Sequence, residues 1–211
     1  MCRLLWLRAD KPFDVRSHLT HFARLCRDST EYQGHGWGCA WLQGDSWHFH
    51  HSLSPIWDDD LTAFGGTHLF LAHARSAFRD EGIAIENNMP FVQDDEVFIF
   101  NGELNGVRIR EEGRIGAEKI FNYTRRFSHL GALPRLKKSV EVIEKRTRYV
   151  RAMNLIMATP ERSLLATVYN ETPGYFQMQR TSVGSLDAVC SEQYPVSGSW
   201  QPVENRTVIE L

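Results

Sequence analysis

The sequence contains few cysteines and no long apolar run, and these absences exclude several classes of protein. Its four cysteines are scattered among 211 residues and include no C-x-x-C pair, so a disulfide framework is not expected. No apolar stretch approaches the roughly 18 residues of a membrane-spanning helix, and the N-terminal segment does not resemble a signal peptide. We therefore expect a cytoplasmic protein whose thiols stay reduced.

The sequence also lacks an excess of charge of either sign. Its formal net charge of −2 gives no electrostatic reason to expect nucleic acid or a membrane as a partner. His48, His50 and His51 lie close together, but strand alternation separates them. No acidic or cysteine partner stands nearby at ligand spacing, so we expect no metal site. Nothing in the sequence indicates a cofactor.

Apolar segments follow one another in blocks rather than in alternating βαβ units. Helical patterns are expected from Pro12, after Asn105 (residues 105–112) and over 116–129. The basic run 137–151 is interpreted as a solvated helical face rather than a binding patch. Strands are expected over 2–7, 39–42, 46–52, 68–73, 96–100, 154–158, 163–169, 175–181, 187–190 and 206–211. This order predicts one α+β domain over residues 1–211.

Cys2 is the most informative single residue, because it follows the initiator methionine directly. If Met1 is removed, residue 2 carries both a thiol and a free α-amine. The reference pKa of an α-amine is about 7.7–8.0, close to that of a cysteine thiol at about 8.5. An N-terminal cysteine therefore has a general base next to its own nucleophile. Position alone is also consistent with a chance Met-Cys start.

Two further segments contain residues suited to a reactive site. Three glycines between residues 34 and 38 surround Trp37 and permit a tight wall beside a reacting group, although a hairpin entrance with Trp37 in the core is equally consistent. An apolar run then ends in His73, Arg75 and Ser76. The guanidinium fork of Arg75 suits bidentate binding of a carboxylate, with a surface ion pair as the alternative.

A third segment offers hydrogen-bond donors at the end of a hydrophobic strand. Asn101 and Gly102 can direct a side-chain amide and a backbone N–H to one point, as an oxyanion hole requires. A hairpin turn is the alternative, but the helical pattern after Asn105 argues against it. The preceding loop that contains Asn87 predicts only a turn.

Together these segments resemble the class II glutamine amidotransferases, whose glutaminase domains are N-terminal nucleophile hydrolases. The resemblance covers residues 2–121, with a weaker match at Ser191, Glu192 and Trp200. It implies a four-layer αββα sandwich with Cys2 as nucleophile, Arg75 at the substrate α-carboxylate, and Asn101 and Gly102 at the oxyanion. Further substrate-binding residues implied by the same segments are His73, Ser76, Trp37, Gly38, Asn87 and Glu118.

One departure from the family pattern concerns the substrate's α-amino group. The family places an Asp two residues before a Glu, and here Gly116 occupies the Asp position before Glu118. Glu111 or Glu112 could supply a substitute charge.

The resemblance implies release of ammonia from glutamine through a thioester on Cys2. A synthase partner that accepts ammonia would then lie on another protein. Two alternatives stay open: hydrolysis of a larger γ-glutamyl amide or peptide, and a non-catalytic subunit that keeps the fold.

Overall fold

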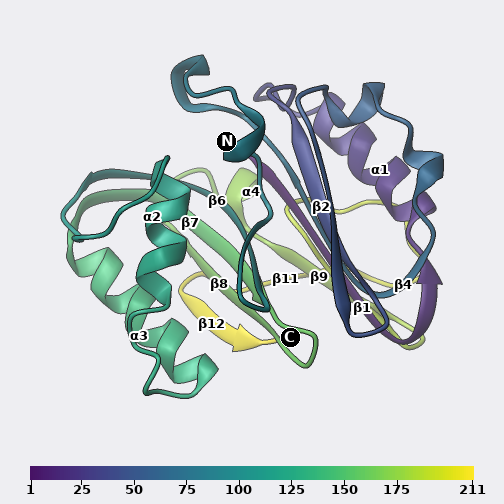
Figure 1. Cartoon of the computed structure of the whole chain (residues 1–211). Helices are drawn as coiled ribbons and strands as arrows, with labels where there is room; N and C mark the ends of the chain where they lie inside the picture. The colour runs from purple at the N-terminus through teal and green to yellow at the C-terminus, as the bar shows by residue number, and fades with distance from the viewer. The chain divides into compact units, whose positions relative to one another are not determined.

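The chain folds into two compact units, each built on one antiparallel sheet. The computed structural model describes all 211 residues. The first unit comprises Met1–Pro90 and Met178–Val203, and the second comprises Phe91–Gln177 and Glu204–Leu211. Figure 1 shows the ribbon of the whole chain.

The first unit contains a seven-stranded sheet in the order β11-β9-β10-β1-β4-β2-β3. Strand β1 lies inside the sheet and pairs antiparallel with both β10 and β4. Residue 2 therefore stands at the head of an internal strand. The strands are β1 (Arg3–Asp14), β2 (Trp37–Gln43), β3 (Ser46–Ser52), β4 (Gly66–Ala74), β9 (Gln179–Val183), β10 (Leu186–Cys190) and β11 (Gln201–Pro202).

Helix α1 (Arg16–Arg27) packs its apolar side against one face of this sheet. Leu19, Phe22 and Cys26 recur at helical spacing and are buried in one core cluster with Leu5 and Phe70 of the sheet. The opposite face of the internal strands is buried as well, because Trp6 and Leu71 have almost no exposed surface.

The helical pattern expected from Pro12 starts later than predicted. Strand β1 continues through Pro12 to Asp14, where Asp14 pairs with Gly66 of β4. The helix begins only at Arg16. The pairing of β1 with β4, which a local pattern does not reveal, takes precedence over the helical spacing.

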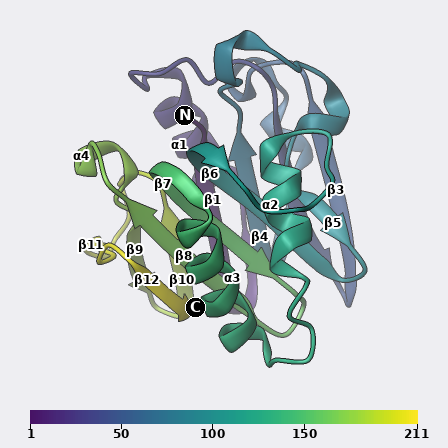
Figure 2. The ribbon, with the colours of Figure 1, turned by 90° about the vertical axis from the view of Figure 1, so that its left-hand side faces the viewer.

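The second unit contains a five-stranded sheet in the order β12-β8-β7-β6-β5. The aromatic rings of Phe98 on β6 and Phe121 on α2 stack with centroids 4.9 Å apart, and helix α3 also packs on the strands. Figure 2 shows α2 and α3 in front of the strands of this unit. Its elements are β5 (Phe91–Gln93), β6 (Glu96–Val107), α2 (Gly116–Thr124), α3 (Ala132–Lys145), β7 (Thr147–Ala158), β8 (Ser163–Tyr169), α4 (Pro173–Phe176) and β12 (Thr207–Glu210).

Two of the expected elements are wrong. No helix covers residues 105–112, because β6 continues to Val107 and pairs there with Thr147 of β7. The strand expected over 175–181 is interrupted, because Tyr175 lies in the short helix α4 and β9 begins at Gln179. At residues 105–107 long-range strand pairing thus decides the structure.

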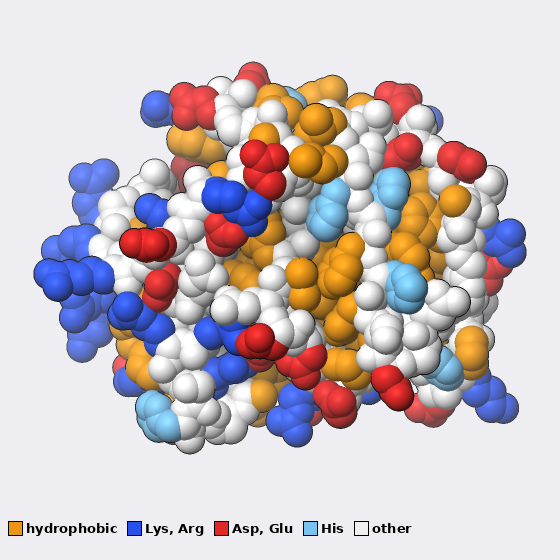
Figure 3. Space-filling view, in the orientation of Figure 1, with side chains coloured by type: hydrophobic (Ala, Val, Ile, Leu, Met, Phe, Trp, Pro, Cys, Tyr) orange, Lys and Arg blue, Asp and Glu red, His pale blue; other side chains and the backbone are white.

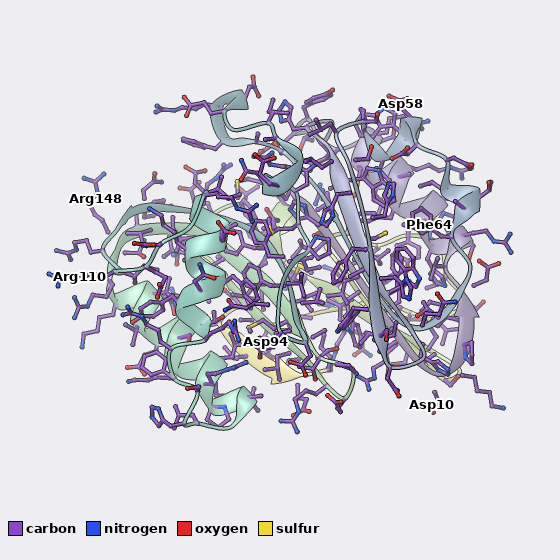
Figure 4. All side chains as sticks on the ribbon, in the orientation of Figure 1. Asp10, Asp58, Phe64, Asp94, Arg110 and Arg148 are labelled. Atoms are coloured by element: carbon purple, nitrogen blue, oxygen red, sulfur yellow. The ribbon has the colours of Figure 1, made fainter.

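The basic run 137–151 is helical only in its first part. Helix α3 ends at Lys145 and strand β7 begins at Thr147. Arg148 on β7 and Arg110 after β6 lie at the same end of this unit in Figure 4, where Figure 3 shows a group of Lys and Arg side chains. The basic surface therefore belongs to the end of the β6–β7 pair as well as to the helix.

The α+β class is confirmed, with two antiparallel sheets and four α-helices. The first unit supplies one sheet and α1, and the second supplies one sheet with α2 and α3. Each unit thus pairs one antiparallel sheet with its own helices. None of the helices has the length and apolar character needed to cross a membrane.

Candidate active site

Cys2 is held at the start of β1 by strands on both sides. Toward β4, the backbone N–H of Ser76 donates to the Cys2 Sγ over 3.4 Å. Toward β10, the backbone N–H of Leu4 donates to Ser191 Oγ over 2.8 Å, and Arg3 forms an ion pair with Glu192 at 3.0 Å. The weak sequence match at Ser191 and Glu192 thus lies beside the segment that carries the nucleophile.

The surroundings of Cys2 keep its thiol protonated near neutral pH. Burial raises the pKa of the Cys2 thiol, while the N-terminal ammonium, the Ser76 N–H and the Arg75 guanidinium oppose that rise. Because the thiolate is the nucleophilic form, a thiol with a raised pKa needs a base to become reactive. A free α-amine on the same residue would supply that base.

Arg75 follows the end of β4, and its guanidinium is turned into the loop at residues 82–88. The side chain is buried, donating to the Gly82 carbonyl over 2.8 Å and to Asn88 Oδ1 over 3.3 Å. Asn87 Nδ2 donates to the same Gly82 carbonyl over 3.0 Å. The Arg75 side chain therefore does not form the surface ion pair that the sequence left as an alternative. These two hydrogen bonds fix the orientation of the guanidinium group. Its other N–H groups can donate to the carboxylate of a substrate.

Gly36 and Gly38 allow the same loop to lie against the start of β2. A Cβ on Gly36 would meet Asn88 Nδ2 at 2.2 Å, and one on Gly38 would meet the Met89 carbonyl oxygen at 2.5 Å. Gly36 also has φ of +99°, which side chains rarely adopt. The glycine segment is thus a closely packed wall. His73 pairs with Gly38 across β4 and β2, and its side chain is buried.

Trp37 points into the core rather than along this wall. Its ring is fully buried in the cluster beneath α1, with Phe64 packed edge-on at 5.7 Å. Figure 4 labels Phe64 at this place. Its Nε1–H donates to Asp59 Oδ2 over 2.7 Å. The core position is the alternative that the sequence left open for Trp37.

Asn101 and Gly102 lie in the middle of β6 in the second unit, not in a hairpin turn. Neither polar atom of the Asn101 amide has a hydrogen-bond partner in the protein, although the side chain is fully buried. A Cβ on Gly102 would come within 2.4 Å of the Ala152 carbonyl oxygen, so only glycine fits there. An unpartnered buried amide is costly and is typical of a group kept for function.

Two of the acidic residues near the expected amine-binding position, Glu111 and Glu118, are paired with arginines. The Glu118 carboxylate accepts hydrogen bonds from the backbone N–H and the guanidinium of Arg114, and these bonds lower the pKa of the Glu118 carboxyl. Glu111 pairs with Arg126 at 2.8 Å. Gly116 is exposed, and a Cβ built there would meet nothing within 4 Å.

The predicted residues therefore fall into two groups. Hydrogen bonds join Cys2 to Ser76, and join both Arg75 and Asn87 to the Gly82 carbonyl, all within the first unit. Asn101, Gly102 and Glu118 belong to the second unit. Two residues beside Cys2 were missed by sequence reasoning, Glu31 and Gln33. The only feature of the sequence that could have indicated Glu31 and Gln33 is their position directly before the glycine segment.

The fold is that of the class II glutamine amidotransferase domains, as the resemblance implied. No protein-family model matches the chain, and no curated protein does. Solved structures do match. Glutamine phosphoribosylpyrophosphate amidotransferase from B. subtilis superimposes with a TM-score of 0.69 at 15% identity, covering 97% of this chain and 46% of that one. The present chain thus spans about half the length of that relative.

Two other matches are similar in length to the chain. A glutamine aminotransferase class-II domain protein from Silicibacter pomeroyi has a TM-score of 0.65 at 14% identity, covering 100% of this chain and 98% of its own. A predicted glutamine amidotransferase from Pseudomonas aeruginosa has a TM-score of 0.58 at 16% identity, with 99% and 96% covered. At these identities the likeness shows the fold.

Proposed function

We propose that the chain is a class II glutamine amidotransferase-like hydrolase that uses Cys2 as an N-terminal nucleophile. The observation that carries this proposal is the Cys2 thiol itself, held at the head of an internal strand by the Ser76 N–H. Its neighbour Arg75 is buried, with its guanidinium fixed by two hydrogen bonds. The cytoplasmic setting, the single domain and an ammonia-accepting synthase partner stay predictions within this proposal.

The proposed reaction begins after removal of Met1. The Cys2 amine takes the thiol proton, directly or through one water, and the thiolate attacks the γ-carbonyl carbon of a γ-glutamyl amide. The Asn101 amide and the Gly102 N–H stabilise the oxyanion, and Arg75 holds the substrate carboxylate. The C–N bond then breaks, the leaving nitrogen takes the proton from the Cys2 ammonium, and water hydrolyses the thioester.

The substrate is the part of the proposal with two candidates. Free glutamine is the first, with ammonia as the product. A larger γ-glutamyl amide or peptide is the second. It is favoured by Gly116, which offers no carboxylate, and by the ion pairs that engage Glu111 and Glu118. Comparing hydrolysis of glutamine with that of larger γ-glutamyl amides and peptides separates the two.

The decisive experiment replaces Cys2 and follows both activity and mass. We expect Cys2→Ala to abolish hydrolysis of γ-glutamyl amides and labelling by a glutamine-like electrophile. Cys26→Ala is the control, because Cys26 lies on the buried side of α1 and its raised pKa keeps it unreactive. An active Cys2→Ala protein would contradict the role of Cys2. Retained Met1 in an active preparation, seen by intact mass, would contradict the α-amine as base. Absence of both activity and labelling in the mature protein would favour a non-catalytic subunit.

A further inference from the structure

The first residue of the chain fills a polar position beside Cys2. The α-ammonium group of Met1 forms an ion pair with the Glu31 carboxylate. The Met1 carbonyl oxygen accepts a hydrogen bond from Gln33 Nε2 over 2.7 Å, and the same nitrogen donates to the Glu31 carbonyl oxygen over 2.8 Å. Two residues just before the glycine segment thus hold both polar ends of Met1.

This position is suited to an ammonium group with an oxygen next to it. Gln33 is fully buried, so the donor that it directs at Met1 is shielded from water. Glu31 is partly exposed, with 35% of its side chain accessible, so a ligand can reach its carboxylate. Charge-assisted hydrogen bonds to a carboxylate are among the stronger polar contacts in proteins.

The position also lies within reach of a substrate attached to Cys2. Consecutive Cα atoms are about 3.8 Å apart, which places Met1 within one residue length of the nucleophile. In a γ-glutamyl group, three C–C bonds of about 1.5 Å separate the scissile carbonyl carbon from the carbon that bears the amine. The distance from Cys2 to Met1 along the chain is therefore comparable to the distance from the scissile carbonyl carbon to the amine-bearing carbon of the substrate.

We propose that Glu31 binds the α-ammonium group of the substrate once Met1 has been removed, and that Gln33 donates to an oxygen beside it. In the unprocessed chain the α-amino-acyl group of Met1 stands in for that part of the substrate. This inference rests on the proposed function and narrows it to γ-glutamyl compounds with a free α-amine. It also supplies a carboxylate where Gly116 has none.

A different role for Glu31 makes a different prediction. Both Glu31 and Arg75 act electrostatically on the Cys2 thiol, so Glu31 could instead face the Cys2 amine. A carboxylate in that place would favour the ammonium form of the amine, which cannot act as a base. Its loss would then change the hydrolysis of every substrate alike and shift the pH profile.

The test compares two γ-glutamyl anilides, one with a free α-amine and one with that amine acetylated. The variants are Glu31→Gln and, as the matched control, Asp28→Asn. Asp28 is an exposed acidic residue nearby whose carboxylate pairs with Arg27. Mature protein lacking Met1, verified by intact mass, is used throughout, and thermal unfolding checks that each variant is folded.

We expect Glu31→Gln to raise KM for the free-amine substrate about tenfold and to leave the acetylated substrate unchanged. The control variant Asp28→Asn should keep the preference of the natural protein for the free-amine substrate over the acetylated one. Equal changes for both substrates, or an unchanged preference, would overturn the inference while leaving the proposed function intact. If the natural protein hydrolyses neither these anilides nor free glutamine, the proposed function fails, and the role of Glu31 fails with it. If it hydrolyses glutamine alone, Glu31→Gln should raise KM for glutamine about tenfold, and an unchanged KM would overturn the inference.

Discussion

Replacing Asn101 with leucine is expected to stabilise the fold while removing activity. Asn101 is fully buried on β6, and neither its amide nitrogen nor its amide oxygen has a partner. A buried polar group without a hydrogen bond costs about 1–3 kcal/mol. Leucine has the same branched shape at Cγ and carries no polar atoms. We therefore expect the free energy of unfolding to rise by about 1–2 kcal/mol.

The chain provides a matched control on the neighbouring strand. Asn154 of β7 pairs with Asn101 across the sheet and is equally buried. Its Nδ2 donates to the Phe176 carbonyl oxygen over 2.7 Å, and its Oδ1 accepts from Thr167 Oγ1 over 2.7 Å. Asn154→Leu leaves both of these partners unsatisfied, so we expect it to lower the free energy of unfolding by about 2–4 kcal/mol.

Denaturant unfolding and hydrolysis of a γ-glutamyl anilide measure the two effects separately. For Asn101→Leu the unfolding midpoint should rise, and kcat should fall by about 10²–10³-fold if the amide stabilises the oxyanion. The reasoning fails if Asn101→Leu destabilises the protein as much as Asn154→Leu does. That result would mean that the Asn101 amide has hydrogen-bond partners within the fold, so that burying it does not lower the free energy of unfolding.

Two further predictions concern packing and pH. Gly38→Ala should cost about 1–3 kcal/mol of stability in denaturant unfolding, because its Cβ would lie 2.5 Å from the Met89 carbonyl oxygen. Gly65→Ala, with nothing within 4 Å, should change it by less than about 0.5 kcal/mol, and equal effects would contradict the close packing. Burial lowers the pKa of His18 and His51, so the unfolded chain binds more protons below its histidine pKa of about 6.5. Stability should therefore fall from pH 7 to pH 5, and less steeply when both are replaced by Gln.

The sequence pattern predicted correctly those helices and strands that are determined by residues close together in the chain. The hairpin of β2 and β3 follows from alternation around a short turn, and β8 (Ser163–Tyr169) matches its predicted bounds. Residues 105–107, where a helix was expected to begin, are strand, because Thr147 and its neighbours on β7 pair with them from about 40 residues away. No pattern within 105–112 contains that information.

For the site, the sequence likewise indicates which residues are chemically suited, but not which of them lie together in the fold. The sequence indicated Cys2 and Arg75 from their chemistry, but the hydrogen bond from Ser76 to Cys2 requires β1 and β4 to be neighbours. Glu31 and Gln33 have no motif of their own. They are recognised only because the fold brings them to the residue before Cys2.

Asn101 and Asn154 show why burial alone does not identify a functional side chain. Both are polar, fully buried and paired across one sheet, so a sequence or a burial profile treats them alike. Hydrogen bonding separates them, because Asn154 is satisfied by Phe176 and Thr167 while Asn101 is not satisfied at all. A satisfied buried amide contributes to stability, whereas an unsatisfied one lowers it and persists only where another use outweighs the cost. Under the proposed function, that use is stabilisation of the charge that develops on the substrate oxygen in the transition state.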